Sequence, residues 1–547
     1  GELVVRVLKG EGVRYLFSLS GGHINPIYDA CLDARIQVID VRHEQAAALM
    51  AEGWALSTGQ PGVCCITAGP GITNAVSGVA NAYLSGVPLI ALGGSSPLKQ
   101  SDMGSLQDMD QMSLMRPITK WSRVVHEPER IPEYMAMAFR HALSGRPGPV
   151  YLEIPWDVIY RQVEEREGLF PIHYRTSARP GGDPDRIEEA LKLLAAAQRP
   201  VLIAGSGSWW SGAAAELKEF VERTKVPALT LNAGRGILPD DHPLCFGPAT
   251  PFYGGELSQL VLQQADLILL LGSRLLYTLL YGRFHPQARV IQVDLEASEI
   301  GRNRPIDVGI VGDAAQVLQQ LTQGAPIGTE TAWHATLRET KRAREERLQQ
   351  LAASDALPMH PLRLCREIRD FLDKEAIVVC DGGDISAWAN ALIPAYTPGS
   401  RLTHGPLGCL GIGLPYAIAA KLAHPDRPVL LITGDGSFGL NGMEFDTAIR
   451  HQIPIVCVIG NDEAWGMIKH SQAMTYGASR IVGSQLGVRH YERMVEGLGG
   501  YGEFVTAPRE IRPALERAFA SGKPACVNVM TDPQVMSEGL KFLASAM

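Results

Sequence analysis

The chain has 547 residues, which at ~150 residues per domain predicts three or four domains. Its 50 basic and 58 acidic residues give a net charge of −8, without a Lys/Arg-rich run that would indicate a nucleic-acid or anionic-membrane surface. No apolar stretch approaches the ~18 residues that a membrane span needs. The first residues read as folded sequence rather than as the apolar core of a signal peptide.

Three segments of the chain follow the same pattern of buried strand, Gly-rich turn, amphipathic helix and parallel strand. The first and third run from Thr67 to Pro88 and from Thr433 to Pro454, and both span 21 positions. The middle copy begins near Leu202 and is two residues longer. This repetition predicts an α/β protein with three doubly wound parallel-sheet domains.

The composition of two segments between the predicted domains supports the division into three. Residues 162–185 are charged and then rich in Arg, Pro and Gly, and residues 323–360 contain a helix dense in Arg and Glu at 338–347. We therefore expect domains at 1–170, 185–325 and 355–530, the last ending in a strand at 525–530. Residues 531–547 then form a C-terminal tail, which is either a lid or a frayed end.

The nine cysteines are scattered, and no two of them form a Cys-x-x-Cys pair. Several lie in strand-like apolar runs, such as Cys64, Cys65 and Cys457. Buried reduced thiols are the simplest interpretation, which indicates a cytoplasmic protein in a reducing compartment.

The most specific local motif is Gly434-Asp435-Gly436, followed 27 residues after Asp435 by Asp462. Both acids follow apolar runs that read as neighbouring strands, so they are expected at the carboxyl edge of one sheet. Two carboxylates at this edge suit a divalent cation such as Mg²⁺ that holds substrate phosphates, and the glycines allow close backbone approach to phosphate oxygens.

Gly-Asp-Gly followed at this spacing by an Asn-containing pair resembles the diphosphate and metal motif of thiamine diphosphate enzymes. The resemblance covers nearly the whole chain and implies three domains: pyrimidine-binding, middle and diphosphate-binding. It implies thiamine diphosphate and Mg²⁺ as cofactors, with the metal on Asp435, the Asp462 side chain and the Ala464 carbonyl. The family's usual Asn-Asn is Asn461-Asp462 here, and the added negative charge favours tighter Mg²⁺ retention.

The same resemblance implies further cofactor contacts in three parts of the chain. The contacts on the pyrimidine side are Pro70 and Asn74. Leu410, in the segment that begins at Gly408, is expected to support the bent cofactor. The alternative, that Leu410 is an ordinary core leucine, fits the sequence equally well. The contacts expected around the diphosphate are Gly383, Asp384, Gly434, Gly436, Ser437, Trp465, Gly466 and Met467.

Glu44 follows a strand-like run and opens a helix of small apolar residues. An acid in a first helical turn is favoured by the helix dipole alone. Beside the other motifs, Glu44 resembles the family's activating glutamate. A carboxyl group in apolar surroundings has a raised pKa, so it can share a proton with the cofactor's pyrimidine nitrogen and promote removal of the thiazolium proton.

The segment at 293–301 resembles the middle domain of the acetolactate synthase and benzaldehyde lyase branch. The motif Gly460-Asn461-Asp462-x-x-Trp465 is most similar to that of 2-hydroxyacyl-CoA lyase. Acetolactate synthases carry a small residue where this chain has His23, whereas benzaldehyde lyase and one group of 2-hydroxyacyl-CoA lyases carry histidine. An uncharged imidazole can accept the substrate's hydroxyl proton. The alternative is a hydrogen-bonded loop histidine without a catalytic role. Gln107 resembles a pocket glutamine of the whole branch. The resemblance thus implies a carbon–carbon lyase and carboligase that converts a 2-hydroxyacyl-CoA to formyl-CoA and an aldehyde or ketone, with benzoin cleavage and acetolactate synthesis as alternatives. A cofactor-binding regulatory subunit is the non-enzyme alternative, against which Glu44 argues.

We also expect a nucleotide site in the middle domain and an assembly of more than one chain. Gly205-x-Gly207 and Asp294 at a strand end are suited to the adenosine moiety of CoA or of ADP, although a lone Gly-x-Gly is a weak signal. As partners we expect a small-molecule substrate, an acyl-CoA or a 2-hydroxy ketone, and a second copy of the chain. The family implies a homodimer or homotetramer with active sites between chains.

Overall fold

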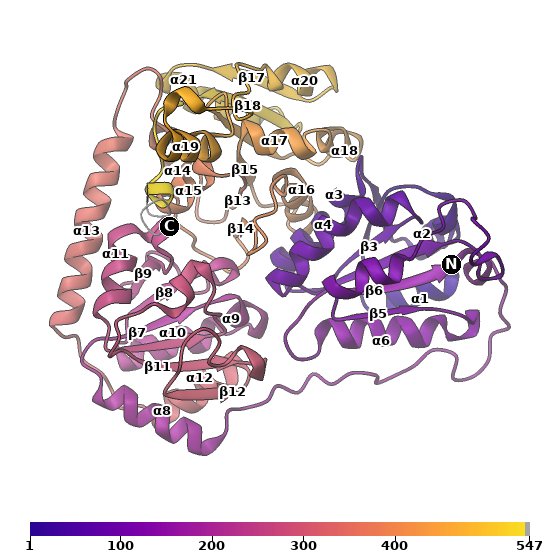
Figure 1. Ribbon diagram of the computed structural model, residues 1–547, viewed down its shortest axis with the longest axis horizontal. Coiled ribbons are helices and arrows are strands. Elements are labelled where there is room, and N and C mark those ends of the chain that lie inside the picture. Colours follow the sequence, from indigo (N-terminus) through magenta and orange to yellow (C-terminus); the bar gives the residue numbers. More distant parts are fainter. Residues whose placement is uncertain (542–547) are drawn as a thin grey trace. The chain divides into compact units, whose positions relative to one another are not determined.

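The computed structural model describes residues 1–541, and its strands form three six-stranded sheets (Figure 1). Every pairing between the named strands of this part of the chain is parallel. Parallel neighbours need crossover connections, and helices supply them in all three sheets. The prediction of three α/β domains is therefore confirmed.

The first sheet has the strand order β2-β1-β3-β4-β6-β5. Its strands are β1 (Tyr15–Ser18), β2 (Gln37–Asp40), β3 (Gly62–Ile66), β4 (Leu89–Ser95), β5 (Trp121–Val124) and β6 (Val150–Pro155). Its helices are α1 (Glu2–Gly10), α2 (Asn25–Ala34), α3 (Glu44–Thr58), α4 (Pro70–Ser85), α5 (Gln111–Met115), α6 (Ile131–Leu143) and α7 (Trp156–Ile159).

The second sheet has the order β12-β11-β10-β7-β8-β9. Its strands are β7 (Pro200–Ala204), β8 (Ala228–Thr230), β9 (Cys245–Pro248), β10 (Leu267–Leu271), β11 (Arg289–Asp294) and β12 (Val308–Val311). The helices that accompany it are α8 (Pro184–Ala196), α9 (Ser206–Ser211), α10 (Ala214–Thr224), α11 (Pro251–Gln264) and α12 (Ala314–Gly324), and the charged linker forms α13 (Ala332–Ala352).

The third sheet has the order β14-β13-β15-β16-β18-β17. Its strands are β13 (Ile377–Cys380), β14 (Arg401–Thr403), β15 (Val429–Gly434), β16 (Val456–Asn461), β17 (Tyr501–Val505) and β18 (Ala525–Met530). The helices in this part of the chain are α14 (Pro361–Phe371), α15 (Asp384–Leu392), α16 (Gly413–Ala423), α17 (Asp435–Asn441), α18 (Glu444–Arg450), α19 (Gly466–Tyr476), α20 (Tyr491–Gly497) and α21 (Pro508–Ala520).

The first and third sheets share one topology. Numbered within its own sheet, each reads 2-1-3-4-6-5, whereas the middle sheet reads 3-2-1-4-5-6, the order of dinucleotide-binding folds. The equal spacing of the first and third segments in the sequence thus reflects equal topology. The helix expected after β7 and after β15 is split in two; after β7 the break falls at Gly212, whose φ of 66° ends α9 in the left-handed conformation.

By their internal contacts the residues form two compact units. The first contains residues 1–177, 404–426 and 440–455; the second contains residues 178–403, 427–439 and the described chain from 456 onward. Helices α16 and α18 therefore cluster with the first sheet and not with the third. Small residues make this packing possible: a Cβ added at Gly53 of α3 would lie 2.9 Å from the Cα of Tyr416 in α16.

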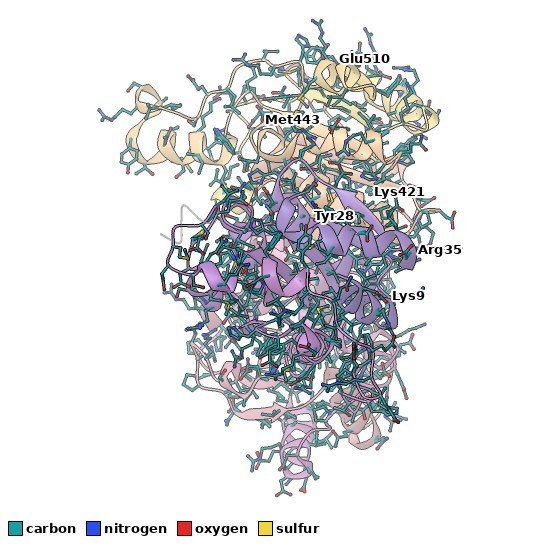
Figure 2. All side chains as sticks on the ribbon, turned by 90° about the vertical axis from the view of Figure 1, so that its right-hand side faces the viewer. Lys9, Tyr28, Arg35, Lys421, Met443 and Glu510 are labelled. Carbon is teal, nitrogen blue, oxygen red and sulfur yellow. The ribbon has the colours of Figure 1, made fainter. Side chains whose placement is uncertain are left out.

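Burial follows the apolar pattern of the sequence. All five residues of β10 are buried, as a central strand covered on both faces requires. In the first unit, α1 and α6 cover one face of the sheet (Figure 1), and the polar ends of its helices reach the surface, where Lys9 and Arg35 are exposed (Figure 2). All nine cysteines are free thiols, and eight of them are buried. No helix among residues 1–541 is long and apolar enough to cross a membrane.

Candidate active site

Polar side chains gather where the first four strands of the first sheet end. His23 follows β1, Glu44 follows β2, Asn74 follows β3, and Gln107 follows β4. The carboxyl edge of a parallel sheet is where open α/β folds bind ligands. We call this group, with the loop at residues 67–74, the first half-site.

Glu44 is the first residue of α3, as the sequence predicted, and its side chain is only 5% exposed. Its carboxylate accepts a hydrogen bond of 2.9 Å from Nδ2 of Asn74, which lies in the first turns of α4. The N-terminus of a helix stabilises a carboxylate, so α3 favours an acid here. The structure thus places Glu44 and Asn74 together in one hydrogen-bonded pair.

His23 lies in a short 3-10 helix at Gly22–Ile24 and contacts the loop that follows β3. Its Nδ1 is 3.2 Å from Oγ1 of Thr67. Partial burial lowers the pKa of His23 below its usual value. The imidazole is therefore uncharged near neutral pH, the state in which a histidine accepts a proton.

A buried glutamine that the sequence analysis did not select organises the same loop. Oε1 of Gln111 accepts a 2.7 Å hydrogen bond from the backbone N–H of Gly69. Its Nε2 donates to the carbonyl of Gly94 and to Oε2 of Glu153, both at 3.0 Å. Burial raises the pKa of Glu153. No spacing in the sequence links these residues, which meet only because β4 and β6 are neighbours.

The remaining residues predicted for this side lie at or near the surface of the first unit. Pro70 is the exposed first residue of α4, and Gln107 is half-buried with a φ of 61°, its backbone against Gly69. Leu410 is half-buried in the segment that begins at the exposed Gly408. Its neighbour Cys409 accepts a hydrogen bond of 3.6 Å from Nε2 of Gln45, so this segment lies beside the start of α3.

A second half-site lies in the second unit, at the carboxyl edge of the third sheet. It consists of the turns after β13, β15 and β16, which lie beside one another because β15 pairs with both β13 and β16. These turns contain all the predicted diphosphate contacts: Gly383, Asp384, Gly434, Asp435, Gly436, Ser437, Asp462, Ala464, Trp465, Gly466 and Met467. The sequence analysis therefore selected residues that the fold brings together.

Two acids of the second half-site, Asp435 and Asp462, interact closely with each other. Asp435 is 1% exposed, and neither of its carboxylate oxygens has a hydrogen-bond partner within the described chain. Burial and the negative charge of Asp462 raise the pKa of Asp435 well above its usual range, and burial also raises the pKa of Asp462. A cation between the two carboxylates would remove this penalty.

Mg²⁺ fits these donors. It is commonly held by one or two carboxylates together with substrate phosphates rather than by a cage made only of protein ligands. Residues 1–541 contain no cluster of three or more His, Cys, Asp or Glu side chains suited to a metal. Asp435 and Asp462 are thus suited to Mg²⁺ with a diphosphate.

Close packing explains the glycines of this half-site. A Cβ added at Gly466 would lie 2.0 Å from Oδ2 of Asp462, and one added at Gly436 would lie 2.7 Å from the ring of Trp465. Any larger residue at Gly466 would displace the Asp462 carboxylate. The glycines therefore leave room for the acidic and aromatic side chains as well as for a ligand.

Asn461 has a different role from Asp462. Its Nδ2 donates to Oδ1 of Asn528 at 3.0 Å, and its Oδ1 accepts from the N–H of Glu463 at 3.1 Å. Asn461 is fully buried at the end of β16. The side chain of Asn461 is thus used in hydrogen bonds within the protein, whereas that of Asp462 extends toward Gly466.

Asp384 is also engaged by protein groups. Its Oδ2 is 3.0 Å from Nδ1 of His470, and Ser537 donates a hydrogen bond to its Oδ1. This pairing raises the pKa of His470. Neither partner was selected from the sequence. Through Ser537, the described part of the predicted tail contacts the first residue of α15; residues 542–547 lie outside the described chain.

The Gly-x-Gly turn of the middle domain is tightly packed. A Cβ at Gly205 would lie 2.5 Å from the carbonyl oxygen of Gly272, and one at Gly207 would lie 2.7 Å from the Cα of Gly272. Packing alone therefore accounts for both glycines. Asp294 ends β11 and accepts a hydrogen bond of 2.9 Å from the N–H of Glu296.

Three family models match the chain, one for each sheet. They are the thiamine pyrophosphate enzyme N-terminal TPP binding domain at residues 1–114, the central domain at residues 187–321 and the C-terminal TPP binding domain at residues 381–529. The first and third models cover the first and second half-sites.

Curated relatives are similar over nearly the whole length. A "Probable acetolactate synthase" of Mycobacterium bovis is 39% identical over 98% of this chain and 96% of its own. A "Probable acetolactate synthase large subunit" of Methanocaldococcus jannaschii is 34% identical over 97% and 92%. The "2-hydroxyacyl-CoA lyase 1" of Homo sapiens is 31% identical over 99% and 96%.

Proposed function

Because the chain belongs to the thiamine pyrophosphate enzyme family, we propose that it is a carbon–carbon lyase and carboligase that cleaves a 2-hydroxyacyl-CoA to formyl-CoA and an aldehyde or ketone. The observation that carries this proposal is the position of His23, an imidazole with a lowered pKa in the half-site that contains Glu44. Cleavage beside a hydroxyl-bearing carbon needs a group that takes the hydroxyl proton.

Thiamine diphosphate (thiamine pyrophosphate), when bound, supplies a nucleophilic carbon and accepts the electrons of the bond that breaks. Glu44 holds the proton that activates it, and the hydrogen bond from Asn74 orients the carboxylate. Pro70 and Leu410 bind the pyrimidine side. The unpartnered oxygens of Asp435 support Mg²⁺ binding by Asp435, Asp462 and the Ala464 carbonyl, and the turns around Gly436, Ser437 and Gly466 hold the diphosphate.

His23 receives the substrate proton in this proposal. Because Nδ1 is next to Oγ1 of Thr67, Nε2 is the ring nitrogen assigned to the transfer. The hydroxyl proton moves to Nε2 while the carbon–carbon bond breaks. Gln107 lies on the neighbouring loop, and we assign it to substrate positioning.

Acetolactate synthesis is the second candidate. The Mycobacterium bovis relative, which is 39% identical, is named a probable acetolactate synthase. Gln107 is compatible with either reaction. Synthesis begins with decarboxylation of pyruvate, a step that needs no acceptor for a hydroxyl proton. Benzoin cleavage is the third candidate, and it needs the same acceptor as the CoA lyase.

We place the adenosine moiety of CoA, or of ADP, in the middle domain. The support is topological, because the strand order of the middle sheet reverses between β7 and β10. Ligands of doubly wound sheets bind at such a switch point. Asp294, at the end of the adjacent β11, is positioned to bind a ribose hydroxyl.

We also propose assembly as a homodimer or homotetramer with active sites formed between chains. The segment around Gln107 supports it, because Met103 is 71% exposed and Leu106 is 81% exposed. Large apolar side chains so close together on a surface are typical of a contact with another chain. Sedimentation of the protein with and without cofactor tests this assembly.

A turnover screen tests the function. The holoenzyme is given 2-hydroxyacyl-CoAs of several chain lengths, benzoin and pyruvate, and formyl-CoA, aldehyde and acetolactate are measured. We expect formyl-CoA from at least one 2-hydroxyacyl-CoA at a higher rate than any other product. Faster formation of acetolactate from pyruvate would contradict the lyase proposal and favour the synthase.

A further inference from the structure

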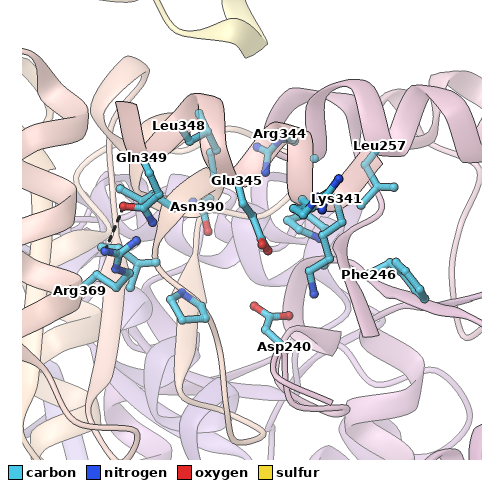
Figure 3. A pocket seen from close by; sticks show the side chains of 18 of the residues that line it. Asp240, Phe246, Leu257, Lys341, Arg344, Glu345, Leu348, Gln349, Arg369 and Asn390 are labelled. Atoms are coloured by element: carbon cyan, nitrogen blue, oxygen red, sulfur yellow. Dashed lines mark hydrogen bonds between the residues drawn. The ribbon is translucent and has the colours of Figure 1, made fainter. Parts of the chain in front are cut away.

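A cavity of about 630 Å³ lies within the second unit, and none of its lining residues belongs to either half-site (Figure 3). Its walls come from the chain between β8 and the first half of α11, from the second half of α13, from Arg369 of α14, and from the C-terminal end of α15 with the residues that follow it. The volume is within the range of small-molecule sites, roughly 300–1,000 Å³. None of the residues Gly205, Gly207, Gly272 and Asp294 lines this cavity.

Arg235 lines the cavity and is only 5% exposed. Its Nη2 pairs with Asp240, which also accepts a hydrogen bond of 2.8 Å from the N–H of Ala395. Nε and Nη1 of Arg235 have no partner among residues 1–541. A buried guanidinium thus has two of its three nitrogens unsatisfied.

Arg344 is a second incompletely paired cation in the cavity wall. Its Nη2 donates to the carbonyl of Tyr253 at 2.6 Å, and its buried Nε has no partner in the described chain. The nearby acids Glu256 and Glu538 both pair with Arg347 instead. Burial lowers the pKa of Arg344, and the negative charges of Glu538 and Glu256 offset this effect only in part.

Arg401 is a third guanidinium next to the cavity, although it does not line it. It is 3% exposed, and its nitrogens donate to Sγ of Cys380 and to the carbonyls of Ile393 and Pro394, two residues that line the cavity. These partners are all uncharged. Of these three arginines, only Arg235 forms an ion pair within 4 Å among the described residues, with Asp240.

This imbalance of charge and hydrogen bonding favours an anionic ligand. Arginine stays protonated in proteins, and a buried charge without a partner is costly. The whole lining has the same bias, with five basic and three acidic side chains: Arg235, Lys341, Arg342, Arg344 and Arg369 against Asp240, Glu345 and Glu346. Figure 3 shows Lys341 and Arg344 reaching the cavity from α13.

The other walls are apolar. Phe246 and Leu257 line the side of the middle domain, and Leu348 lines the side of α13 (Figure 3). Ile393 and Pro394 close the end near α15. Such walls favour a ligand with a hydrocarbon or aromatic part in addition to its charged group.

We propose that this cavity binds a small organic anion whose carboxylate or phosphate group pairs with Arg235 and Arg344 and whose apolar part lies among Phe246, Leu257 and Leu348. The anion completes the hydrogen bonds of the two guanidinium groups, which are suited to two-oxygen head groups. The site is separate from the proposed catalytic residues, so it is a place for a second ligand rather than for the substrate.

Calorimetric titration of the holoenzyme in a phosphate-free buffer tests the proposal with four probes: phenyl phosphate, phenylacetate, inorganic phosphate and acetate. We expect phenyl phosphate or phenylacetate to bind with a Kd below about 1 mM, and the better of the two identifies the head group. Inorganic phosphate and acetate are expected to bind at least ~10-fold more weakly, because they lack the apolar part.

Variants locate the binding. Arg344→Gln should weaken the better aromatic probe at least ~10-fold, the usual effect of losing a charge-assisted hydrogen bond. Arg338→Gln removes an arginine from the same helix outside the cavity and should bind like the wild type. Arg235→Gln should also weaken binding; if it does not fold without its pairing to Asp240, Arg344→Gln decides alone.

Three outcomes would overturn the proposal. They are the absence of saturable binding by all four probes up to about 10 mM, equal binding by the wild type and Arg344→Gln, and equal loss of binding in Arg338→Gln. Inorganic phosphate binding as tightly as phenyl phosphate would overturn the apolar half of the assignment. Because binding is measured directly, none of these outcomes depends on which reaction the enzyme catalyses.

Discussion

Asn74 donates a hydrogen bond of 2.9 Å to the carboxylate of Glu44 and so joins the first turns of α4 to the first residue of α3. The bond restrains an acid that is only 5% exposed at a helix N-terminus. Both helices begin at the same edge of the first sheet. The position of Glu44 is therefore determined by α4 as well as by α3.

The first prediction concerns Glu44. Glu44→Gln should keep the fold and cofactor binding, because the amide is isosteric, but it cannot exchange the activating proton. Hydrogen–deuterium exchange at the thiazolium carbon, followed by NMR after an acid quench, should slow by at least ~10²-fold. Asn74→Ala keeps the carboxylate and should slow exchange less.

Glu52→Gln is the matched control for this experiment. Glu52 is a buried acid on the same helix, and it is held by Asn81 rather than by Asn74. In the Glu52→Gln variant the thiazolium proton should exchange at the wild-type rate. An unchanged exchange rate in Glu44→Gln would show that Glu44 does not activate the cofactor.

The second prediction concerns the metal. Asp435→Ala and Asp462→Ala should each weaken binding of Mg²⁺ and thiamine diphosphate together, by at least ~10-fold, because the metal bridges protein and diphosphate. Calorimetric titrations of each component in the presence of the other measure this coupling. Removing Mg²⁺ with a chelator should reduce the cofactor affinity of the wild type and change that of Asp462→Ala much less.

Asn461→Ala distinguishes the two members of the Asn-Asp pair. Because Asn461 is hydrogen-bonded to Asn528 inside the fold, this variant should lose stability, by ~1–3 kcal/mol, rather than metal binding. Normal cofactor affinity in Asp462→Ala, with weak affinity in a folded Asn461→Ala, would move the metal ligand to Asn461.

The third prediction separates the candidate reactions through His23. His23→Ala should depress cleavage of 2-hydroxyacyl-CoA by ~10²–10⁴-fold, the usual contribution of a positioned general base. Thiazolium exchange should stay near normal, since Glu44 is unchanged. Both rates are measured on one preparation. His126→Ala, an exposed histidine of the same unit, serves as the control, and normal cleavage by His23→Ala would contradict the lyase proposal.

The fourth prediction is a pH dependence of stability that arises from Glu52. Burial raises the pKa of Glu52 to about 7, above the value of about 4.3 expected for an unfolded chain. The folded state therefore binds more protons, and the contribution of Glu52 to stability is complete below about pH 4 and is lost as the pH rises through about 7. Glutamine at this position cannot ionise, so Glu52→Gln should not show this loss of stability as the pH rises.

Melting curves at several pH values test this prediction. At pH 8, Glu52→Gln should be more stable than the wild type by up to ~3 kcal/mol, whereas near pH 4 the two should be similar. Glu129→Gln replaces an exposed acid of the same unit and should follow the wild-type curve throughout. Parallel curves for the wild type and Glu52→Gln would show that Glu52 is ionised in the folded protein.

The fold was accessible from the sequence because parallel strands buried on both faces leave a simple signal. The run at Leu267–Leu271 and the strand at Ala525–Met530 are apolar whatever their neighbours are, and the Gly-rich turns mark where each strand ends. The equal spacing from Thr67 to Pro88 and from Thr433 to Pro454 reflects two sheets with one topology. The split helices were not predicted, because the breaks at Gly212 and after Asn441 are local turns within an otherwise helical pattern.

The sequence by itself determined which residues stand at the ends of strands, and therefore that Glu44, Asp435 and Asp462 lie at sheet edges. Only the tertiary structure decided their partners. The pairing of Asn74 with Glu44, of Gln111 with Gly69 and Glu153, and of Asp384 with His470 joins residues far apart in the chain. Strand order brings such residues together, and strand order leaves no local pattern in the sequence. The same reason applies to the cavity lined by Arg235 and Arg344. From the sequence alone, both residues are ordinary charged side chains, and only the fold buries guanidinium nitrogens that lack a hydrogen-bond partner among the described residues.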